Sequence, residues 1–255
     1  MDLFSNLEEP TLPFIIPDNI ESSHQWDDHL KIFRIRLPHG ELLYSRRFFS
    51  SEVSDRALAY LQENDTHDSK FNNWRELAKD ENTKIRFSNI NWNQDTINLY
   101  GKTSPLPRLT AWYGDSESSY SYSGIKSKPN PWNKGLLYMK SEIERVTCTS
   151  FNSVLLNWYR DGDDHLGWHA DNERELGTNP TIASLSLGET RDFVLRLNNA
   201  PSEKFTIPLE HGSLLVMYGD MQKFWQHSLP KRKKIRKSRI NLTFRQIKTG
   251  DNNGC

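Results

Sequence analysis

The sequence predicts a mostly β protein with flanking helices. The chain has 255 residues, of which 35% are hydrophobic and 11% aromatic, so one large domain can bury a core. After residue 149 the sequence breaks into short segments rich in β-branched and apolar residues, each bounded by Gly, Asn, Asp or Pro. This spacing is typical of an antiparallel sandwich or barrel. The first half contains helical periodicities, and we expect it to pack against the β-sandwich.

The first half predicts an extension, a strand, helices and a hairpin. Residues 1–40 contain four prolines and lack clear periodicity, so we expect a partly ordered extension. Residues 41–49 read as a strand, and Ser51 can cap a helix with apolar residues at four-residue spacing. Apolar residues over 71–77 indicate a second short helix. Residues 84–100 alternate apolar and polar side chains, which indicates two strands or a hairpin.

The second half predicts one helix followed by strands. A helix is expected to begin near Pro131, because the apolar residues after it recur at intervals of three and four and form one buried face. The segments that read as strands are 153–160, 181–188, 191–197, 213–219 and 239–246.

Charge, hydropathy and cysteine content indicate what kind of protein this is and which partners it could bind. The net charge is zero, but residues 221–248 contain ten Lys or Arg and no acidic residue. This run suggests a polyanion partner, but from the charge run alone a solvated basic loop is the favoured explanation. No stretch approaches the roughly 18 apolar residues of a membrane span, and the first residues do not resemble a secretory signal. Only Cys148 and Cys255 are present, too few for a disulfide framework. We therefore expect a soluble intracellular protein.

Two histidines and a carboxylate form a candidate metal site. His169 and Asp171 are two positions apart, so on a strand they face the same way. A chain of this composition is expected to contain about 0.5 such His-x-Asp pairs by chance, so the pair alone is weak evidence for a metal site. His227, which lies 56 residues downstream of Asp171, would complete the facial triad of non-haem Fe(II) oxygenases. Zinc competes for the same ligands, and an ordinary surface histidine is the plain alternative for His227.

A polar alternation near the C-terminus could serve a bound anion. Arg239, Asn241, Thr243 and Arg245 occupy alternate positions and would share one face of a strand. Arginines pointing into a sandwich need anions to pair with, and a dicarboxylate cosubstrate would supply them. The alternative is that these residues form the solvent-facing side of an edge strand.

Taken together, these residues resemble the AlkB family of Fe(II)- and 2-oxoglutarate-dependent nucleic-acid dealkylases, and most closely its eukaryote-type DNA and RNA repair members. The resemblance runs from about residue 99 to residue 247 and includes the shared phrases PRLTAWYGD, IASLSLG, HGSLLVM and NLTFR. Its pattern N-x-Y-x-x-G, H-x-D, H, R-x-N-x-T-x-R falls here on Asn157, Tyr159, Gly162, His169, Asp171, His227, Arg239, Asn241, Thr243 and Arg245. The family implies a double-stranded β-helix (jelly-roll) core over 131–248, a nucleotide-recognition lid with helices over 41–130, and a tail over 249–255.

The resemblance also implies roles for individual residues. Fe(II) would be held by His169, Asp171 and His227, and 2-oxoglutarate by Asn157, Tyr159, Arg239, Asn241, Thr243 and Arg245. The expected substrate contacts are Leu99, Tyr100, Gly101, Lys102, Arg108, Tyr120, Tyr122, Asn172 and Glu173. Among these, 99–102 match the finger that fills the gap left by a flipped base in duplex DNA, and Tyr122 would stack on the target base. Lys102, Arg108 and the basic cluster 231–237 are suited to phosphates. Two departures are Asn172 and Tyr100, where the duplex-DNA branch more often has Asp and Phe.

The implied function is oxidative demethylation of N-alkylated bases in DNA, of the 1-methyladenine and 3-methylcytosine type. O₂ would be consumed, and succinate and formaldehyde would be released. The alternatives are the same chemistry on RNA, a non-catalytic nucleic-acid-binding jelly roll, and a zinc hydrolase that ignores 2-oxoglutarate. We expect a monomer that acts on alkylated nucleic acid without a membrane or an obligate protein partner, in the bacterial cytoplasm or the eukaryotic nucleus.

Overall fold

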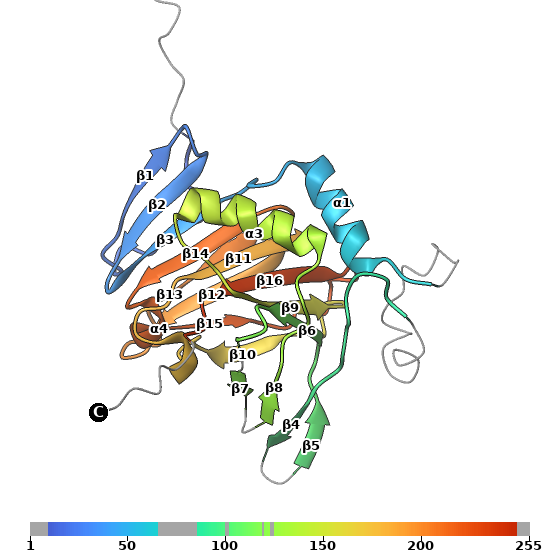
Figure 1. Ribbon diagram of the computed structural model, residues 1–255. Coiled ribbons are helices and arrows are strands. Elements are labelled where there is room, and N and C mark those ends of the chain that lie inside the picture. Colours follow the sequence, from blue (N-terminus) through green and yellow to red (C-terminus); the bar gives the residue numbers. More distant parts are fainter. Residues whose placement is uncertain (1–9, 66–85, 100–101, 119, 123–124, 249–255) are drawn as a thin grey trace, which may run out of the picture.

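The fold is built on two antiparallel sheets (Figure 1). The computed structural model describes residues 10–65, 86–99, 102–118, 120–122 and 125–248. The large sheet has the order β1 (Ser23–Asp27), β2 (Ile32–Leu37), β3 (Gly40–Ser45), β14 (Leu214–Gly219), β11 (Ile182–Gly188), β16 (Arg239–Arg245), β9 (Ser153–Tyr159) and β6 (Leu109–Gly114). The small sheet has the order β10 (Leu166–His169), β15 (Trp225–Leu229), β12 (Arg191–Leu197) and β13 (Lys204–Leu209).

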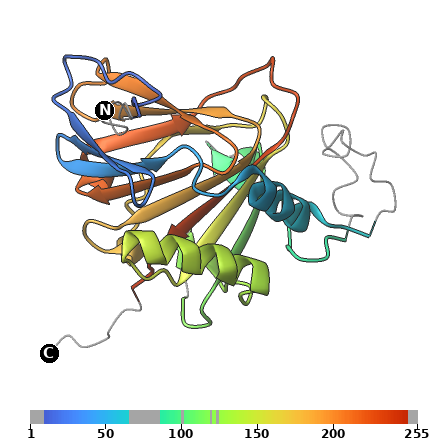
Figure 2. The same ribbon diagram turned by 90° about the horizontal axis from the view of Figure 1, so that it is seen from above.

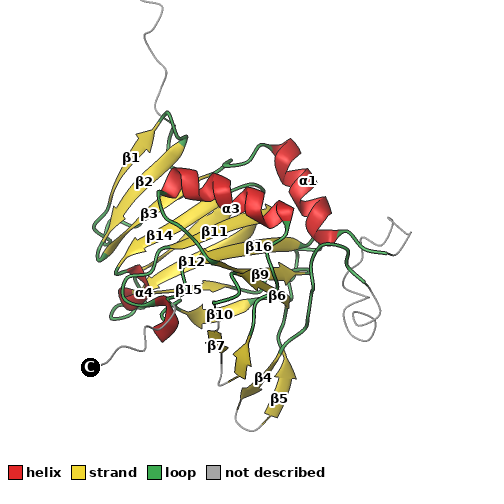
Figure 3. Cartoon of the chain, viewed as in Figure 1, coloured by secondary structure: helices red, strands yellow, loops and turns green. Residues whose placement is uncertain are grey.

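Two hairpins and several helices complete the described elements. The hairpins pair β4 (Thr96–Leu99) with β5 (Lys102–Pro105) and β7 (Tyr120–Tyr122) with β8 (Ile125–Ser127). The helices are α1 (Ser51–Gln62), α3 (Lys134–Thr147), the short α4 (Met221–Phe224) and the 3₁₀ turn η1 (Arg174–Leu176). The helices α1 and α3 lie over one face of the large sheet, as Figures 1, 2 and 3 show. None of the described helices has the length and apolar character that a bilayer span requires.

Strand β16 explains how the two layers are built. It lies between β11 and β9, so it is a central strand of the large sheet. Its apolar residues Ile240, Leu242 and Phe244 are fully buried in the cluster that also contains the inward face of α3. Because side chains alternate along a strand, Arg239 and Asn241 point to the opposite face, toward the small sheet. The polar alternation therefore faces the interior of the sandwich, and the edge-strand alternative is wrong.

Both long helices begin at polar caps. The Ser50 hydroxyl accepts a hydrogen bond from the Val53 amide at 3.3 Å, so the cap of α1 is Ser50 and not the expected Ser51. In α3 the Asn133 side chain accepts from the Leu136 amide at 2.9 Å, and the helix starts three residues after Pro131. The apolar face predicted for this helix is confirmed, because its side chains are buried against the large sheet.

Within the extension expected over 1–40, the described residues 10–40 include two strands. Strands β1 and β2 continue the large sheet beyond β3, and β2 reads Ile-Phe-Arg-Ile-Arg-Leu with exposed arginines between buried apolar residues. This alternation of apolar and charged residues could have predicted β2 from the sequence. The sequence predictions also missed β6, β10, β13 and β15 as strands. The helix expected over 71–77 lies outside the described residues, and of 86–99 only Thr96–Leu99 forms a strand.

Candidate metal centre and cosubstrate pocket

The structure brings His169, Asp171 and His227 together. His169 ends β10 and pairs in register with His227 of β15, and Asp171 follows two residues later. One potential ligand atom from each residue lies within 4.8 Å of the other two. Asp171 and His227 are 3% and 5% exposed, so an ion held here would be largely withdrawn from bulk water. Among the described residues this is the single group of three or more such side chains close enough for a metal ion.

Both imidazoles are prepared to act as ligands. The His169 Nδ1 atom lies 2.9 Å from the carbonyl oxygen of Gly167, which can only accept, so Nδ1 donates and Nε2 is the atom left to bind a metal. Burial, reinforced by nearby His169, lowers the pKa of His227 to about 3. His227 also stacks on Phe193 with ring centroids 5.0 Å apart. A neutral imidazole held by packing is the form that metal ions bind.

The carboxylate of Asp171 is ionised and anchored at both ends. Burial alone would raise its pKa, but the charge and hydrogen bond of Arg245 lower it below its usual value. Arg245 pairs with Oδ1, and Oδ2 lies 3.6 Å from His227 Nε2. The Asp171 amide donates to Gln222 Oε1 at 2.9 Å, and Gln222 is itself buried. Sequence reasoning missed Gln222, because a single glutamine carries no motif.

The cosubstrate residues expected from the resemblance line one interior face. Strands β9 and β16 pair Tyr159 with Arg239 and Asn157 with Asn241. Arg239 donates to Ser186 Oγ and to Asn241 Oδ1, both at 2.9 Å. The remaining hydrogen bonds along the row are 2.7 Å each, from Ser184 to Asn241 and from Asn241 to Thr243. Ser184 and Ser186 were not predicted, since serines in a strand are common.

Arg239 makes this row suited to an anion. It is 2% exposed, and its Nε atom is buried without a hydrogen-bond partner among the described residues. No ion pair to it is found in the described part of the chain. Burial lowers its pKa to about 10. A buried cation without a carboxylate is costly, so the pocket is suited to a ligand that brings one. The residues therefore fit both Fe(II) and 2-oxoglutarate.

The expected substrate residues have mixed outcomes. Arg108 is 7% exposed and its Nε donates to Asn157 Oδ1 at 2.8 Å, so it lies in the interior beside the cosubstrate row and away from a surface phosphate. Asn172 is exposed, and Glu173 is half-buried with its Oε2 atom buried. Tyr120 and Tyr122 belong to the described strand β7. Leu99 pairs with Lys102 in the β4–β5 hairpin. Tyr100 and Gly101, which join these strands, lie outside the described residues.

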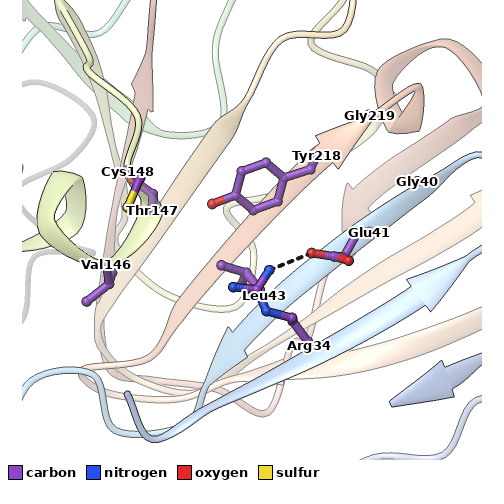
Figure 4. A pocket seen from close by; sticks show the side chains of 9 residues that line it. All are labelled: Arg34, Gly40, Glu41, Leu43, Val146, Thr147, Cys148, Tyr218 and Gly219. Atoms are coloured by element: carbon purple, nitrogen blue, oxygen red, sulfur yellow. Dashed lines mark hydrogen bonds and ion pairs between the residues drawn. The ribbon is translucent and has the colours of Figure 1, made fainter. Parts of the chain in front are cut away.

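A separate hollow of about 460 Å³ lies away from the metal centre (Figure 4). It is bounded by β2, β3, β14 and the end of α3, and the Arg34–Glu41 ion pair of 2.9 Å crosses it. None of its lining residues belongs to the metal or cosubstrate sets. The candidate site is therefore defined by its side chains and not by this cavity.

Comparison with known proteins shows the family of this chain. The family model described as 2OG-Fe(II) oxygenase superfamily matches residues 62–245. "DNA oxidative demethylase ALKBH2" of Arabidopsis thaliana is 37% identical over 84% of this chain and 68% of that protein. "Alpha-ketoglutarate-dependent dioxygenase alkB homolog 3" of Mus musculus is 49% identical over 57% of this chain, and the chain spans 53% of its length. For "DNA oxidative demethylase ALKBH2" of Homo sapiens the identity is 44%, over 59% of this chain and 60% of that protein.

A solved structure has the same fold. "The structure of OsALKBH1" superposes with a TM-score of 0.50 and 14% identity, covering 80% of this chain and 96% of that chain. At this identity the likeness supports the jelly-roll fold alone. The matched family model and the Arabidopsis relative agree on the family. The chain belongs to the 2OG-Fe(II) oxygenase superfamily and, within it, to the AlkB family.

Proposed function

We propose that this protein is an Fe(II)- and 2-oxoglutarate-dependent dioxygenase that removes N-methyl groups from bases in DNA. The observation that carries the proposal is Arg239, a buried cation without a carboxylate partner among the described residues, in the same interior as the His169, Asp171 and His227 cluster. A metal cluster alone fits zinc as well. Because buried Arg239 also requires an anionic partner, the site favours 2-oxoglutarate.

Each set of residues has a distinct task. His169, Asp171 and His227 would hold Fe(II) through three positions, leaving the others for cosubstrate and O₂. When bound, the iron supplies the oxidation of the methyl group, with succinate, CO₂ and formaldehyde as products. Arg239 would fix the far carboxylate of 2-oxoglutarate and so orient the molecule along the row. Phe193, stacked on His227, shields one side of the centre from water.

Backbone hydrogen bonds to Gly162 hold the loop that carries the basic residues 231–237, and this order favours a nucleic-acid substrate. The Arg232 amide donates to the Gly162 carbonyl at 2.7 Å, and the Gly162 amide donates to the Ile235 carbonyl at 3.0 Å. A Cβ on Gly162 would collide with the Arg232 carbonyl, so only glycine allows this contact. Within the run 231–237, the lysines and Arg236 are exposed. Cations on an ordered loop are suited to phosphates, because less side-chain and backbone freedom is lost on binding.

Glu173 is the candidate for selecting damaged bases. It follows Asp171 by two residues, and its buried Oε2 atom has no hydrogen-bond partner among the described residues. A methyl group on a ring nitrogen of adenine or cytosine gives the base a positive charge. A carboxylate two residues after the metal ligand Asp171 would favour that cation over a neutral base.

We expect Glu173→Gln to lose discrimination between cationic and neutral methylated bases. The amide keeps the shape of the side chain and removes its charge, so turnover of 1-methyladenine should fall by about tenfold or more, equal to roughly 1.4 kcal/mol. Turnover of a neutral methylated base should change little. Steady-state kinetics on two oligonucleotides that differ only in the lesion will measure this, and unchanged selectivity would remove Glu173 from the role.

The proposed function is tested by product analysis. Purified protein is incubated with Fe(II), ascorbate, 2-oxoglutarate and oligonucleotides that carry several methylated bases, and the products are read by mass. We expect bases that are lighter by one methyl group, together with succinate, only when 2-oxoglutarate is present. Demethylation without 2-oxoglutarate would support the zinc alternative. Nucleic-acid binding without succinate would support a non-catalytic jelly roll.

RNA is the second candidate substrate, because the same core would act on it. The β4–β5 hairpin is the feature that favours duplex DNA over RNA. A finger that fills the gap left by a flipped base offsets part of the unstacking energy, which single strands do not require. We expect Tyr100→Ala to lower activity on methylated double-stranded DNA by about tenfold, roughly 1.4 kcal/mol, and to affect the matching single strand far less. Parallel assays on single-stranded DNA, duplex DNA and single-stranded RNA of one sequence provide the measurement. Equal losses on all three, with a lower melting temperature, would mean that Tyr100 only stabilises the hairpin.

A further inference from the structure

The residues that precede the two histidine ligands meet on the outer face of the small sheet. Trp168 precedes His169 on β10, and Gln226 precedes His227 on β15. Because side chains alternate along strands, both point away from the metal centre. Trp168 remains 38% exposed. Neither residue can bind the metal, yet each shares a peptide bond with one of its ligands.

Arg196 of β12 joins these two side chains. Its guanidinium carbon lies 4.0 Å from the centroid of the Trp168 ring. Its Nε and Nη2 atoms donate to Gln226 Oε1 at 3.1 and 2.7 Å. Arg196 and Gln226 are register partners on adjacent strands. One planar side chain therefore connects three neighbouring strands, with its flat face on the tryptophan and its edge on the glutamine.

Strand β10 is the element that most needs such a connection. It has four residues, lies at the edge of the small sheet, and pairs with β15 at Leu166–Leu229 and His169–His227 with an irregularity between them. A strand interrupted in this way is bent and weakly paired. His227, by contrast, lies on β15, which is flanked by β10 and β12. The position of His169 relative to His227 therefore depends on side-chain contacts as well as on backbone hydrogen bonds.

We propose that Trp168, Arg196 and Gln226 form a clasp that positions the metal ligands. The clasp holds β10 against β15, so that His169 Nε2 stays within reach of His227 and Asp171. Its three members are positioning residues and do not touch the metal. The inference rests on the metal site of the proposed function and adds residues on the opposite face of the same strands.

The test measures metal binding without substrate. Co(II), which has a visible ligand-field spectrum, is titrated into metal-free wild-type protein and into Trp168→Ala, Arg196→Ala and the double variant. We expect each single variant to bind Co(II) about tenfold more weakly, at the lower end of the loss known for residues that orient ligands. The double variant should be no weaker than either single one, because removing one member already opens the clasp. Trp168→Phe, which keeps an aromatic face, should recover most of the affinity.

Controls separate the clasp from other roles. Lys204→Ala is the matched control, because Lys204 pairs with Arg196 on β13, is exposed and is likewise basic. It should leave Co(II) affinity and the spectrum unchanged. The melting temperature of the metal-free variants should fall by less than about 3 °C, since the stack is on the surface.

Three outcomes overturn the proposal. Co(II) affinity within a factor of two of wild type, with a large drop in melting temperature, would mean that the stack only stabilises the sheet. Unchanged Co(II) affinity with weaker oligonucleotide binding would make Trp168 and Arg196 a nucleic-acid contact instead. If wild-type protein does not bind Co(II), or Asp171→Ala binds it equally well, the metal site itself fails and the clasp fails with it.

Discussion

Alanine at His169, Asp171 or His227 will reduce turnover to below about one-hundredth of wild type and leave the fold in place. Loss of one of three ligands destroys the geometry of the site, and even residues that only orient ligands cost 10- to 100-fold. The core does not depend on the metal, because neither apolar cluster includes these three side chains, although Phe193 of one cluster stacks on His227. Formaldehyde release will measure the loss of turnover, and circular dichroism of the same samples will show whether the fold is retained.

Two comparisons make this result specific. His29→Ala removes an exposed histidine on the turn between β1 and β2 and should behave as wild type. Asp171→Ala should lose more stability than His169→Ala, because it also removes the carboxylate that pairs with half-buried Arg245. Retention of more than a small residual activity in all three ligand variants would refute the iron site.

Arg239→Ala will raise the 2-oxoglutarate requirement by about a hundredfold or more, equivalent to roughly 2.7 kcal/mol. The reason is that recognition of a carboxylate in a buried pocket is lost entirely when the guanidinium is removed. Oligonucleotide affinity should stay close to wild type, because Arg239 is 2% exposed and cannot reach a substrate at the surface. The KM for 2-oxoglutarate and fluorescence anisotropy with labelled DNA are the two measurements.

Arg239→Met is the control that separates binding from folding. The methionine fills similar space without a charge, and it leaves no buried cation to be neutralised. We expect its melting temperature to equal or exceed that of wild type while its 2-oxoglutarate requirement rises as in the alanine variant. Cosubstrate affinity within a factor of two of wild type in both variants would show that Arg239 does not bind the cosubstrate.

The β-rich second half of the chain was predictable from its sequence. The segments 153–160, 181–188, 191–197, 213–219 and 239–246 all contain the expected strands, with bounds that agree to within one residue. These strands were visible because turn residues delimit them and their interiors are apolar. Strands β10 and β15 were missed, because both are short and contain the polar residues of the site. Function here overrides the local preference for apolar side chains.

The identity of the metal residues was also available from the sequence, but only through the AlkB resemblance. His169, Asp171 and His227 are ordinary residues when each is taken alone, and a pair spaced by two occurs by chance. The structure adds that their ligand atoms lie within 4.8 Å of one another. Gln222 and the clasp of Trp168, Arg196 and Gln226 could not be found in this way. They act through contacts between segments that are distant in sequence, and such contacts leave no local pattern.

The sequence by itself determined the alternation of Arg239, Asn241, Thr243 and Arg245 and therefore that they share one face. Only the tertiary structure decided which way that face points. An edge strand would turn it to water, where arginines need no partner, whereas β16 is central and turns it inward. Arg108 is a second example: the sequence suggested a phosphate contact, but in the structure its side chain is buried and hydrogen-bonded to Asn157. Periodicity fixes the relative orientation of neighbouring side chains, but burial depends on which strands pair, and pairing is set by the energy of the whole core.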